Sequence, residues 1–279
     1  MPEYIRLNFQ TKKLGLEESC IRIYPIVCWH IGAAQSDYKF IKEHVARIKA
    51  DPNAVVVYAG DGAECVVVGS KGDVFKQLCA PQQQQDILVD LLEPIKEKLV
   101  FGIRGNHGHR VYKLTGMDFD KTLCHRLGIP YLGVAAFCNL VVNRSSYDLY
   151  FHHGSDSGTS LRSKIAKAES FDNFIDADAI FTAHSHIAVE LHPKALQSCN
   201  NDTCQVQTRL RHGYICGSAY DSRTGYAEDK AYSPILPAHI SVEFDGRIIE
   251  GHARYGQRCE VFRSDGKHEL HHDYIMENS

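Results

Sequence analysis

Hydrophobic and polar positions follow two different periods along the first part of the chain. An apolar run over 21–28 predicts a strand, and Pro25 within it favours an edge or a bulge. Residues 38–50 place apolar side chains three and four positions apart, which predicts a helix that ends at the turn sequence 51–53. The β-branched run over 54–59 then predicts a short buried strand.

The same alternation of strand and helix continues as far as residue 186. The pattern predicts helices over 84–98 and 160–171, and strands at 99–104, 137–143, 147–151 and 179–182. Repetition of strand, helix and strand is typical of parallel sheets that helices cover. The sequence therefore indicates an α/β fold.

Beyond residue 187 the pattern changes to hairpins. Segments 205–211, 214–217 and 239–244 alternate, and Asp245-Gly246 is a turn signal. The sequence has no internal repeat and no low-complexity linker. We predict a single domain over 1–279 with two packed mixed β-sheets, in which 21–186 carries the chemistry and 187–279 is a β-rich second half.

The composition is that of a globular protein. Hydrophobic residues make up 44% of the 279 positions and charged residues 23%, and the 31 basic and 34 acidic residues leave a formal net charge of −3. This net charge gives no global positive field that would attract nucleic acid. It leaves open whether the protein has a local basic groove. The first residues lack a secretory signal and no apolar stretch nears the roughly 18 residues that a membrane helix needs, so we expect a cytoplasmic protein without a membrane partner.

Ten cysteines in a chain of this length are expected to be mostly buried thiols rather than a disulfide framework. Cys199 and Cys204 flank a turn-like tip. They could form a hairpin clip or half a metal site, and we favour two free thiols.

Polar residues that bind metals follow five of the predicted strands. A single histidine or Gly-Asp pair at a strand end is more often structural, but five such segments in succession are hard to explain as turns. Side chains just past the carboxyl ends of parallel strands meet in one crevice, so we predict that these segments converge. They are Cys28-Trp29-His30, Gly60-Asp61 with Glu64, Gly105-Asn106-His107, His153-Gly154 and His184-Ser185-His186.

In their order, these segments resemble the calcineurin-like metallophosphoesterase family, whose pattern is Asp-x-His, Gly-Asp, Gly-Asn-His-Asp/Glu, His-Gly and Gly-His-x-His. The resemblance runs from about Val27 to Gly217, and Gly217-Ser218 and the segment 225–228 are similar to phage-type and prokaryotic members. It implies a four-layer α/β/β/α sandwich. It also implies a metal-dependent phosphodiesterase or phosphatase that acts on a phosphoester substrate, with a nucleotide or nucleic acid as one candidate.

The resemblance further implies a ligand set for two divalent or trivalent ions, with Fe, Zn and Mn as candidates. Asp61 would bridge the two ions, which would activate water for in-line attack on phosphorus. His107 would not be a ligand; it would stabilise the phosphoryl oxygens and protonate the leaving oxygen. One ion would be held by Cys28, His30, Asp61 and His186, and the other by Asp61, Asn106, His153 and His184.

Two positions depart from the family pattern. Cys28 stands where the family has an aspartate, and a thiolate would favour iron or zinc over Mg²⁺ or Mn²⁺. The other interpretation is that Cys28 does not bind and the site is weakened or mononuclear. Gly108 stands where the family has an acidic residue that orients the catalytic imidazole, and either His109 or Arg110 could compensate or be solvated.

Two neighbours of the ligands have weaker expectations. Glu64 is expected to hold a ligand by hydrogen bonding. His152 is expected to face the other side of its strand from His153, because successive side chains alternate.

Two other classes of function compete with the hydrolase. One is a catalytically impaired scaffold or metal-binding interaction protein on the same fold, against which the retention of Asn106 and His107 argues. The other is a structural zinc protein, which fails because the sequence has no second close cysteine pair to match Cys199 and Cys204. The sequence leaves the substrate, the metals and the oligomeric state open.

Overall fold

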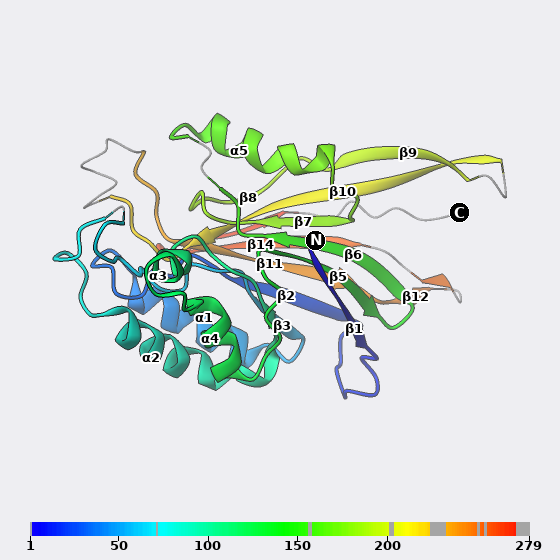
Figure 1. Ribbon diagram of the computed structural model, residues 1–279. Helices are drawn as coiled ribbons and strands as arrows, with labels where there is room; N and C mark the ends of the chain where they lie inside the picture. Colours follow the sequence, from blue (N-terminus) through cyan, green and yellow to red (C-terminus); the bar gives the residue numbers. More distant parts are fainter. Residues whose placement is uncertain are drawn as a thin grey trace.

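A long, curled β-sheet with helices on its outer faces forms the body of the protein (Figure 1). This computed structural model describes residues 2–70, 72–155, 158–200, 204–223, 233–249, 252–253 and 256–271. Within these ranges, 13 strands belong to one sheet and two short strands pair separately. The segment 225–228, which carries part of the family resemblance, lies outside the described residues.

Helices separate the strands from β2 to β5 and from β6 to β7, whereas β1 is followed directly by β2 and β5 directly by β6. The strands are β1 (Glu3–Phe9), β2 (Cys20–Ile26), β3 (Ala54–Tyr58), β4 (Leu99–Gly102), β5 (Ala135–Val142), β6 (Ser145–His152), β7 (Ala179–Thr182), β8 (Ala188–Glu190), β9 (Lys194–Asn200), β10 (Gln205–Ser218), β11 (Ala238–Asp245), β12 (Ile248–Ile249), β13 (His252–Ala253), β14 (Gln257–Arg263) and β15 (His268–His271). The helices are α1 (Tyr38–Ala50), α2 (Pro81–Leu92), α3 (Gly108–Thr115), α4 (Phe119–Leu127) and α5 (Leu161–Glu169), with 3₁₀ helices η1 (Glu93–Lys98) and η2 (Ser170–Asn173).

The sheet has the strand order β1-β5-β6-β7-β10-β11-β2-β3-β4. Its two halves join where β10 pairs with β11, through Gly217 opposite His239 and Ser218 opposite Ala238. Beyond that short junction the halves face each other and enclose the main core, in which the Phe101 and Phe151 rings lie 5.4 Å apart, centroid to centroid. The two sheets predicted from the sequence are therefore two halves of one continuous sheet.

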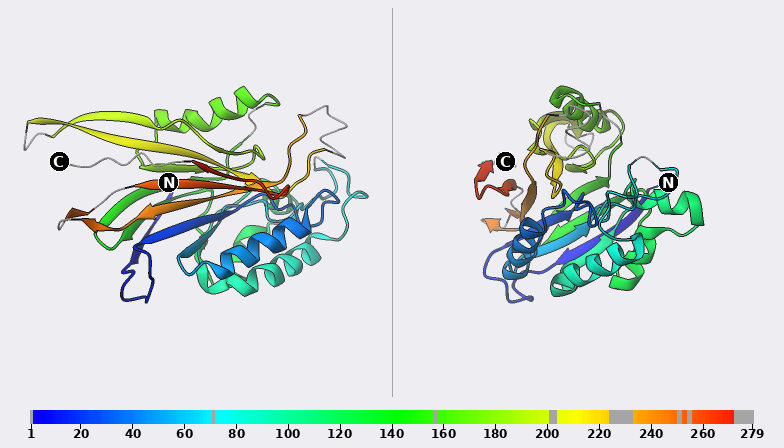
Figure 2. Two further views of the ribbon diagram at one scale, coloured as in Figure 1. Left: turned by 180° about the vertical axis from the view of Figure 1, so that it is seen from behind. Right: turned by 90° about the vertical axis from the view of Figure 1, so that its left-hand side faces the viewer.

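Helices cover both outer faces of the folded sheet. Helix α5 lies over one half, and α1, α2 and α4 lie over the other (Figures 1 and 2). The four-layer α/β/β/α fold class predicted from the sequence is confirmed. No helix among the described residues has both the length and the apolar character needed to cross a membrane.

Local sequence signals explain where the first helices begin and end. Helix α1 has the predicted bounds, because the Asp37 carboxylate accepts a 2.9 Å hydrogen bond from the Phe40 N–H and caps the first turn. The helix predicted over 84–98 begins earlier, with Pro81 in its first turn. It tightens to a 3₁₀ helix after Leu92, since Pro94 has no N–H to continue the α-helical pattern.

The expectation that Pro25 favours an edge strand is wrong, because β2 lies inside the sheet between β11 and β3. The N–H groups of Arg22 and Cys28 donate toward the β3 side, to Asn53 O and Gly60 O. The nitrogen of Pro25 therefore faces the β11 side, where the register of β2 with β11 ends at Ile23. At this level the strand needs no N–H from residue 25.

The second half of the chain is more continuous than its sequence pattern indicates. The segments predicted at 205–211 and 214–217 form the single strand β10, which pairs first with β9 and then with β7 and β8. Cys199 and Cys204 are exposed near the tip of the β9–β10 hairpin and neither is in a disulfide, and residues 201–203 lie outside the described part. Strands β1, β8, β9 and β12 to β15 and helices α3 and α4 have no counterpart among the predicted elements.

Candidate metal centre

The segments that follow β2, β3, β4, β6 and β7 gather at the end of the sheet next to α3 (Figure 1). Each begins within three residues of the strand that precedes it. The segments separated in the sequence are thereby brought to one place, as the hydrogen bonds between their side chains show. The structure brings together Cys28, His30, Asp61, Asn106, His107, His153, His184 and His186.

Several of these side chains are held by backbone that non-glycine residues rarely adopt. The φ angles are positive at Cys28 (48°), His30 (50°), Asp61 (56°), His184 (66°) and His186 (62°). Such conformations cost about 1 kcal/mol or more each and persist only where the surroundings enforce them. Their concentration here indicates that the fold holds these side chains in place at the expense of backbone strain.

Two glycines let the loops after β3 and β4 approach each other. A β-carbon on Gly60 would lie 2.5 Å from the nitrogen of Gly105, and one on Gly105 would overlap the Asp61 carboxylate. Only glycine fits at either position. This contact puts Asp61 beside the loop that carries Asn106 and His107.

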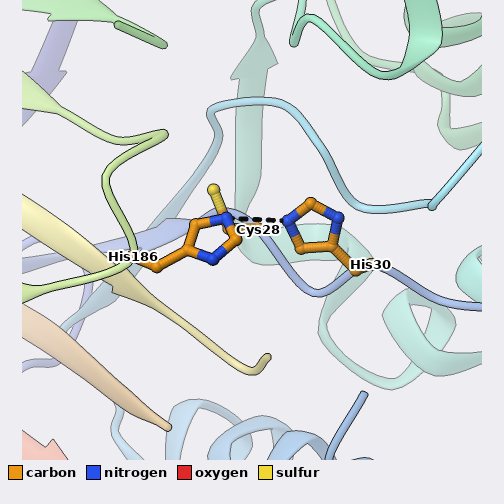
Figure 3. A group of neighbouring side chains, drawn as sticks. All are labelled: Cys28, His30 and His186. Carbon is orange, nitrogen blue, oxygen red and sulfur yellow. Dashed lines mark hydrogen bonds between the residues drawn. The ribbon is translucent and has the colours of Figure 1, made fainter. Parts of the chain in front are cut away.

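The first donor group consists of His30, His186 and Cys28 (Figure 3). The Nε2 atoms of His30 and His186 are 3.0 Å apart, and Nδ1 of His30 lies 2.9 Å from the Glu64 carboxylate. Since a carboxylate accepts, Nδ1 of His30 carries the proton and Nε2 presents a lone pair. The Cys28 sulfur and a nitrogen of each ring lie within 4.8 Å of one another. Glu64 thus makes a hydrogen bond to a candidate ligand, as expected from the sequence.

The second donor group consists of Asp61, Asn106 and His153. Nδ1 of His153 donates a 2.7 Å hydrogen bond to the Ala59 carbonyl, so Nε2 presents its lone pair to Asp61 Oδ2 at 2.9 Å and to Asn106 Oδ1 at 3.1 Å. Nδ1 of His184 lies 2.8 Å from the same Asn106 oxygen. Acceptors that face one another in this way require a proton or a metal cation between them.

The Cys28 sulfur connects the two groups. It lies within 4.8 Å of the ligand atoms of His30 and His186, and also within 4.8 Å of those of Asp61 and His153. Its side chain is buried, and burial together with the Asp61 charge raises the pKa of the thiol well above its ordinary value. A cation at this place would therefore have to displace the thiol proton to gain the sulfur as a ligand.

The charges of the remaining groups suit a cation site. Burial alone would raise the pKa of Asp61, but the neighbouring His153 and His107 outweigh burial and lower the pKa well below its ordinary value. Burial, and then the charge of neighbouring imidazoles, lowers the pKa of both His30 and His186. Burial lowers the pKa of His153, but the charge of Asp61 outweighs it and the net shift is upward, so a cation would have to displace that proton. A carboxylate, imidazoles, an amide oxygen and a sulfur form a donor set that fits iron or zinc.

His107 lies beside these groups with both ring nitrogens engaged. Nδ1 lies 2.8 Å from the Glu64 carbonyl oxygen and Nε2 lies 2.9 Å from a guanidinium nitrogen of Arg110. The backbone N–H of His107 donates to Asp61 Oδ1 at 2.8 Å. Burial lowers the pKa of His107, but the charges of Asp61 and Glu64 outweigh it and the net shift is upward.

Of the residues next to the candidate ligands in the sequence, Arg110 contacts the site, whereas His109 and His152 pack against aromatic rings. Arg110 contacts His107 and Glu64, whereas His109 is stacked on Tyr112 with centroids 5.4 Å apart. His152 packs against Phe171 and its Nδ1 accepts a hydrogen bond from the Gly154 N–H, so it points away from the donor groups as expected.

A buried carboxylate that sequence analysis missed lies under the Asn106–His107 loop. Asp120 Oδ1 accepts a 2.6 Å hydrogen bond from the Tyr58 hydroxyl, and Oδ2 accepts one of 3.2 Å from the Gly105 N–H. A β-carbon on Gly108 would overlap Oδ2, so the glycine at this position makes room for an acid from α4. The signal in the sequence is that Asp120 falls on the same helical stripe as the buried Leu123 and Leu127.

Comparisons with known proteins give only weak likenesses. No family model matches the chain, and no curated relative matches it. Among solved structures, a single mutant of Vps29 from Entamoeba histolytica is 12% identical, with 92% of this chain and 99% of that chain covered and a TM-score of 0.40. The NAD nucleotidase NadN of Haemophilus influenzae is 9% identical, with a TM-score of 0.36, and 92% of this chain spans 50% of that one. At these scores neither likeness assigns an activity to this chain.

Proposed function

We propose that this chain is a metal-dependent phosphoester hydrolase with a two-metal centre. The observation that supports the proposal most is the position of the Cys28 sulfur, which lies within 4.8 Å of donor atoms of His30 and His186 and of Asp61 and His153. Two adjacent donor groups that share neighbours are the arrangement in which a pair of cations is bound close together. Bound cations would supply an activated water molecule and neutralise charge on the phosphoryl oxygens.

The chain's own residues would hold and orient the reacting groups. His30, His186, Asp61 and Cys28 would hold one cation, and Asp61 would also reach the other. Glu64 fixes the tautomer of His30, which keeps Nε2 available as a ligand. Ligands of the second cation would be Asp61, Asn106, His153 and His184.

His107 is the proposed proton donor to the leaving oxygen. For this role the Nε2 atom must face the substrate, and in this structure it accepts from Arg110. Arg110 would therefore move its guanidinium to a phosphoryl oxygen when substrate binds, which frees Nε2. The protein would then act on a phosphodiester or phosphomonoester, with a nucleotide or nucleic acid as candidate substrates.

Metal analysis and a simple assay test the proposal together. The protein is purified without oxygen, its metal content is measured, and bis- and mono-(nitrophenyl) phosphate are assayed after loading with Fe, Mn or Zn. About two metal ions per chain and cleavage of the diester are expected. Failure to bind any metal after each reconstitution would contradict the proposal.

The second candidate function is a metal-binding scaffold without catalysis. The contact of Arg110 with His107 Nε2 favours it, because a permanent contact would keep the imidazole from donating a proton. Two bound metal ions with no cleavage of either ester, in the wild type and in Arg110→Gln alike, would support the scaffold.

A further inference from the structure

A small cleft lies directly against the metal-binding loops, on the side of α5. Gly154 and Ser155 line it immediately after His153, and Ser185 lines it between His184 and His186. Helix α5 contributes Lys164 and Lys167 to the same cleft. The cleft therefore adjoins the loops that carry His153, His184 and His186.

The two lysines are in an unusual position for charged side chains. They are three residues apart on one face of α5, and both are partly buried. Within the described ranges, which leave out 156–157, neither ammonium group has a hydrogen-bonded or ion-paired partner and no carboxylate lines the cleft. Burial lowers the pKa of Lys164, as expected of an ammonium group without a compensating charge.

In the described part of the chain, the ammonium groups of other partly buried lysines have carbonyl or carboxylate partners. Lys98 donates a 2.8 Å hydrogen bond to the Ile48 carbonyl and also contacts the carbonyl of Asp51, while Lys194 pairs with the Asp172 carboxylate. The pair on α5 differs from these, and a bound anion would supply the missing charge. The hydroxyls of Ser155 and Ser185 add neutral donors along the same lining.

The size of the cleft limits what can enter it. Its volume is about 10 Å³, which holds about one water-sized group. A phosphate group can insert one oxygen here and meet the ammonium groups with the others, whereas a base or sugar ring cannot enter. The position beside His153 and Ser185 would put this anion next to the phosphate that the metal ions bind.

We propose that Lys164 and Lys167 form a subsite for a second phosphate group of the substrate. The proposal rests on the proposed function, because the first phosphate is the one that the metal centre would hold. It narrows the substrate class to esters with two phosphate groups. The second phosphate comes either from the neighbouring linkage of a nucleotide chain or from a diphosphate.

Calorimetric titration separates these sources. The ligands are a nucleoside 5′-monophosphate, the 3′,5′-bisphosphate and the 5′-diphosphate of the same nucleoside. The full chain carries His107→Ala so that hydrolysis of the ligands is slow, and it is loaded with zinc. One of the two ligands with two phosphates is expected to bind about tenfold more tightly than the monophosphate, and that ratio falls to about one with Lys164→Gln and Lys167→Gln.

The matched control is the pair Lys39→Gln and Lys42→Gln, which has the same spacing on exposed positions of α1 and should keep the wild-type ratio. A preference for the bisphosphate shows that the second phosphate belongs to the neighbouring linkage of a nucleotide chain. A preference for the diphosphate shows that it belongs to a diphosphate group. Equal affinity for all three ligands, or equal loss of all three affinities in the Lys164 and Lys167 variant, would overturn the subsite.

The zinc stoichiometry from the same experiment keeps the two proposals distinct. A chain that binds no zinc contradicts the proposed function and the subsite together, because no metal ion would then hold the first phosphate. A chain that binds zinc and cleaves the nitrophenyl diester in the wild type, but shows no preference for a second phosphate, contradicts only the subsite.

Discussion

The Tyr58 hydroxyl donates a 2.6 Å hydrogen bond to the Asp120 carboxylate beneath the loop that carries Asn106 and His107. The same hydroxyl accepts a 3.2 Å hydrogen bond from the Gly62 N–H, and Asp120 accepts one from the Gly105 N–H. These bonds tie the loop after β3 to the loop after β4. A pair of buried side chains outside the donor groups thus fixes the relative position of Asp61 and Asn106.

Substitution of Gly108 tests how closely Asp120 is packed against this loop. Gly108→Ala should lower the free energy of unfolding by about 1–3 kcal/mol, because the new methyl group overlaps the Asp120 carboxylate. Denaturant unfolding measures the change, and Lys113→Ala on the exposed side of the same helix should stay within about 0.5 kcal/mol of wild type. Equal effects of the two substitutions would contradict the packing described.

The pH dependence of stability reports on Asp120 in the metal-free protein. Burial, and then the charge of Asp61, raises the pKa of Asp120 to about 7 from its ordinary value of 3.8. The stabilising contribution of the protonated acid is full below about pH 4 and is lost as the pH rises through about 7. Asp120→Asn removes the titration, since the amide can donate to Tyr58 and accept from Gly105.

The free energy of unfolding of Asp120→Asn relative to wild type should therefore increase between pH 4 and pH 8, by an amount on the order of a few kcal/mol. Chemical unfolding at several pH values, in the presence of a chelator, measures this difference. A difference that is constant across the range would show that Asp120 does not titrate there.

The sequence predicts which side chains gather at the candidate site better than it predicts the contacts that hold their loops in place. Each donor segment follows an apolar run directly, and parallel strands bring such ends together regardless of their separation in the sequence. Tyr58 and Asp120 are 62 residues apart, and neither carries a local signal of the contact beyond an acid on an apolar helical stripe. Pro25 was misplaced for a similar reason, because its position depends on where the register with β11 ends.

Cys28 decides the metal preference if its sulfur binds. Cys28→Asp replaces a soft thiolate by a hard carboxylate, so manganese should bind about tenfold more tightly relative to zinc, a change of about 1.4 kcal/mol. Competition between the two metals, followed by mass spectrometry of metals, measures the ratio. Cys138→Ser in the core between the sheet halves is the control, and an unchanged ratio in Cys28→Asp would argue that the sulfur is not a ligand.

Glu64 is predicted to support the proposed metal centre through its hydrogen bond to His30. Glu64→Gln keeps the shape of the side chain but removes the carboxylate that accepts from Nδ1 of His30. The affinity for zinc should fall about 10- to 100-fold, as is typical when the partner of a ligating histidine is changed. Zinc titration against a chelating dye measures it, with Glu43→Gln on the exposed face of α1 as the control. Wild-type affinity in Glu64→Gln would mean that His30 is oriented by other contacts.

Asn106 and His107 are neighbours with different proposed roles, and the difference can be measured. Asn106→Ala removes an oxygen within 3.1 Å of both His153 Nε2 and His184 Nδ1, so it should reduce both the metal content and the hydrolysis of bis(nitrophenyl) phosphate. His107→Ala should retain two metal ions, since His107 is not a proposed ligand, and should lower kcat about 10²- to 10⁴-fold. His109→Ala, which removes a ring stacked on Tyr112, should change neither quantity by more than about twofold, a difference worth about 0.4 kcal/mol. Full activity with His107→Ala would refute its role as the proton donor, and loss of a metal ion in that variant would make His107 a ligand instead.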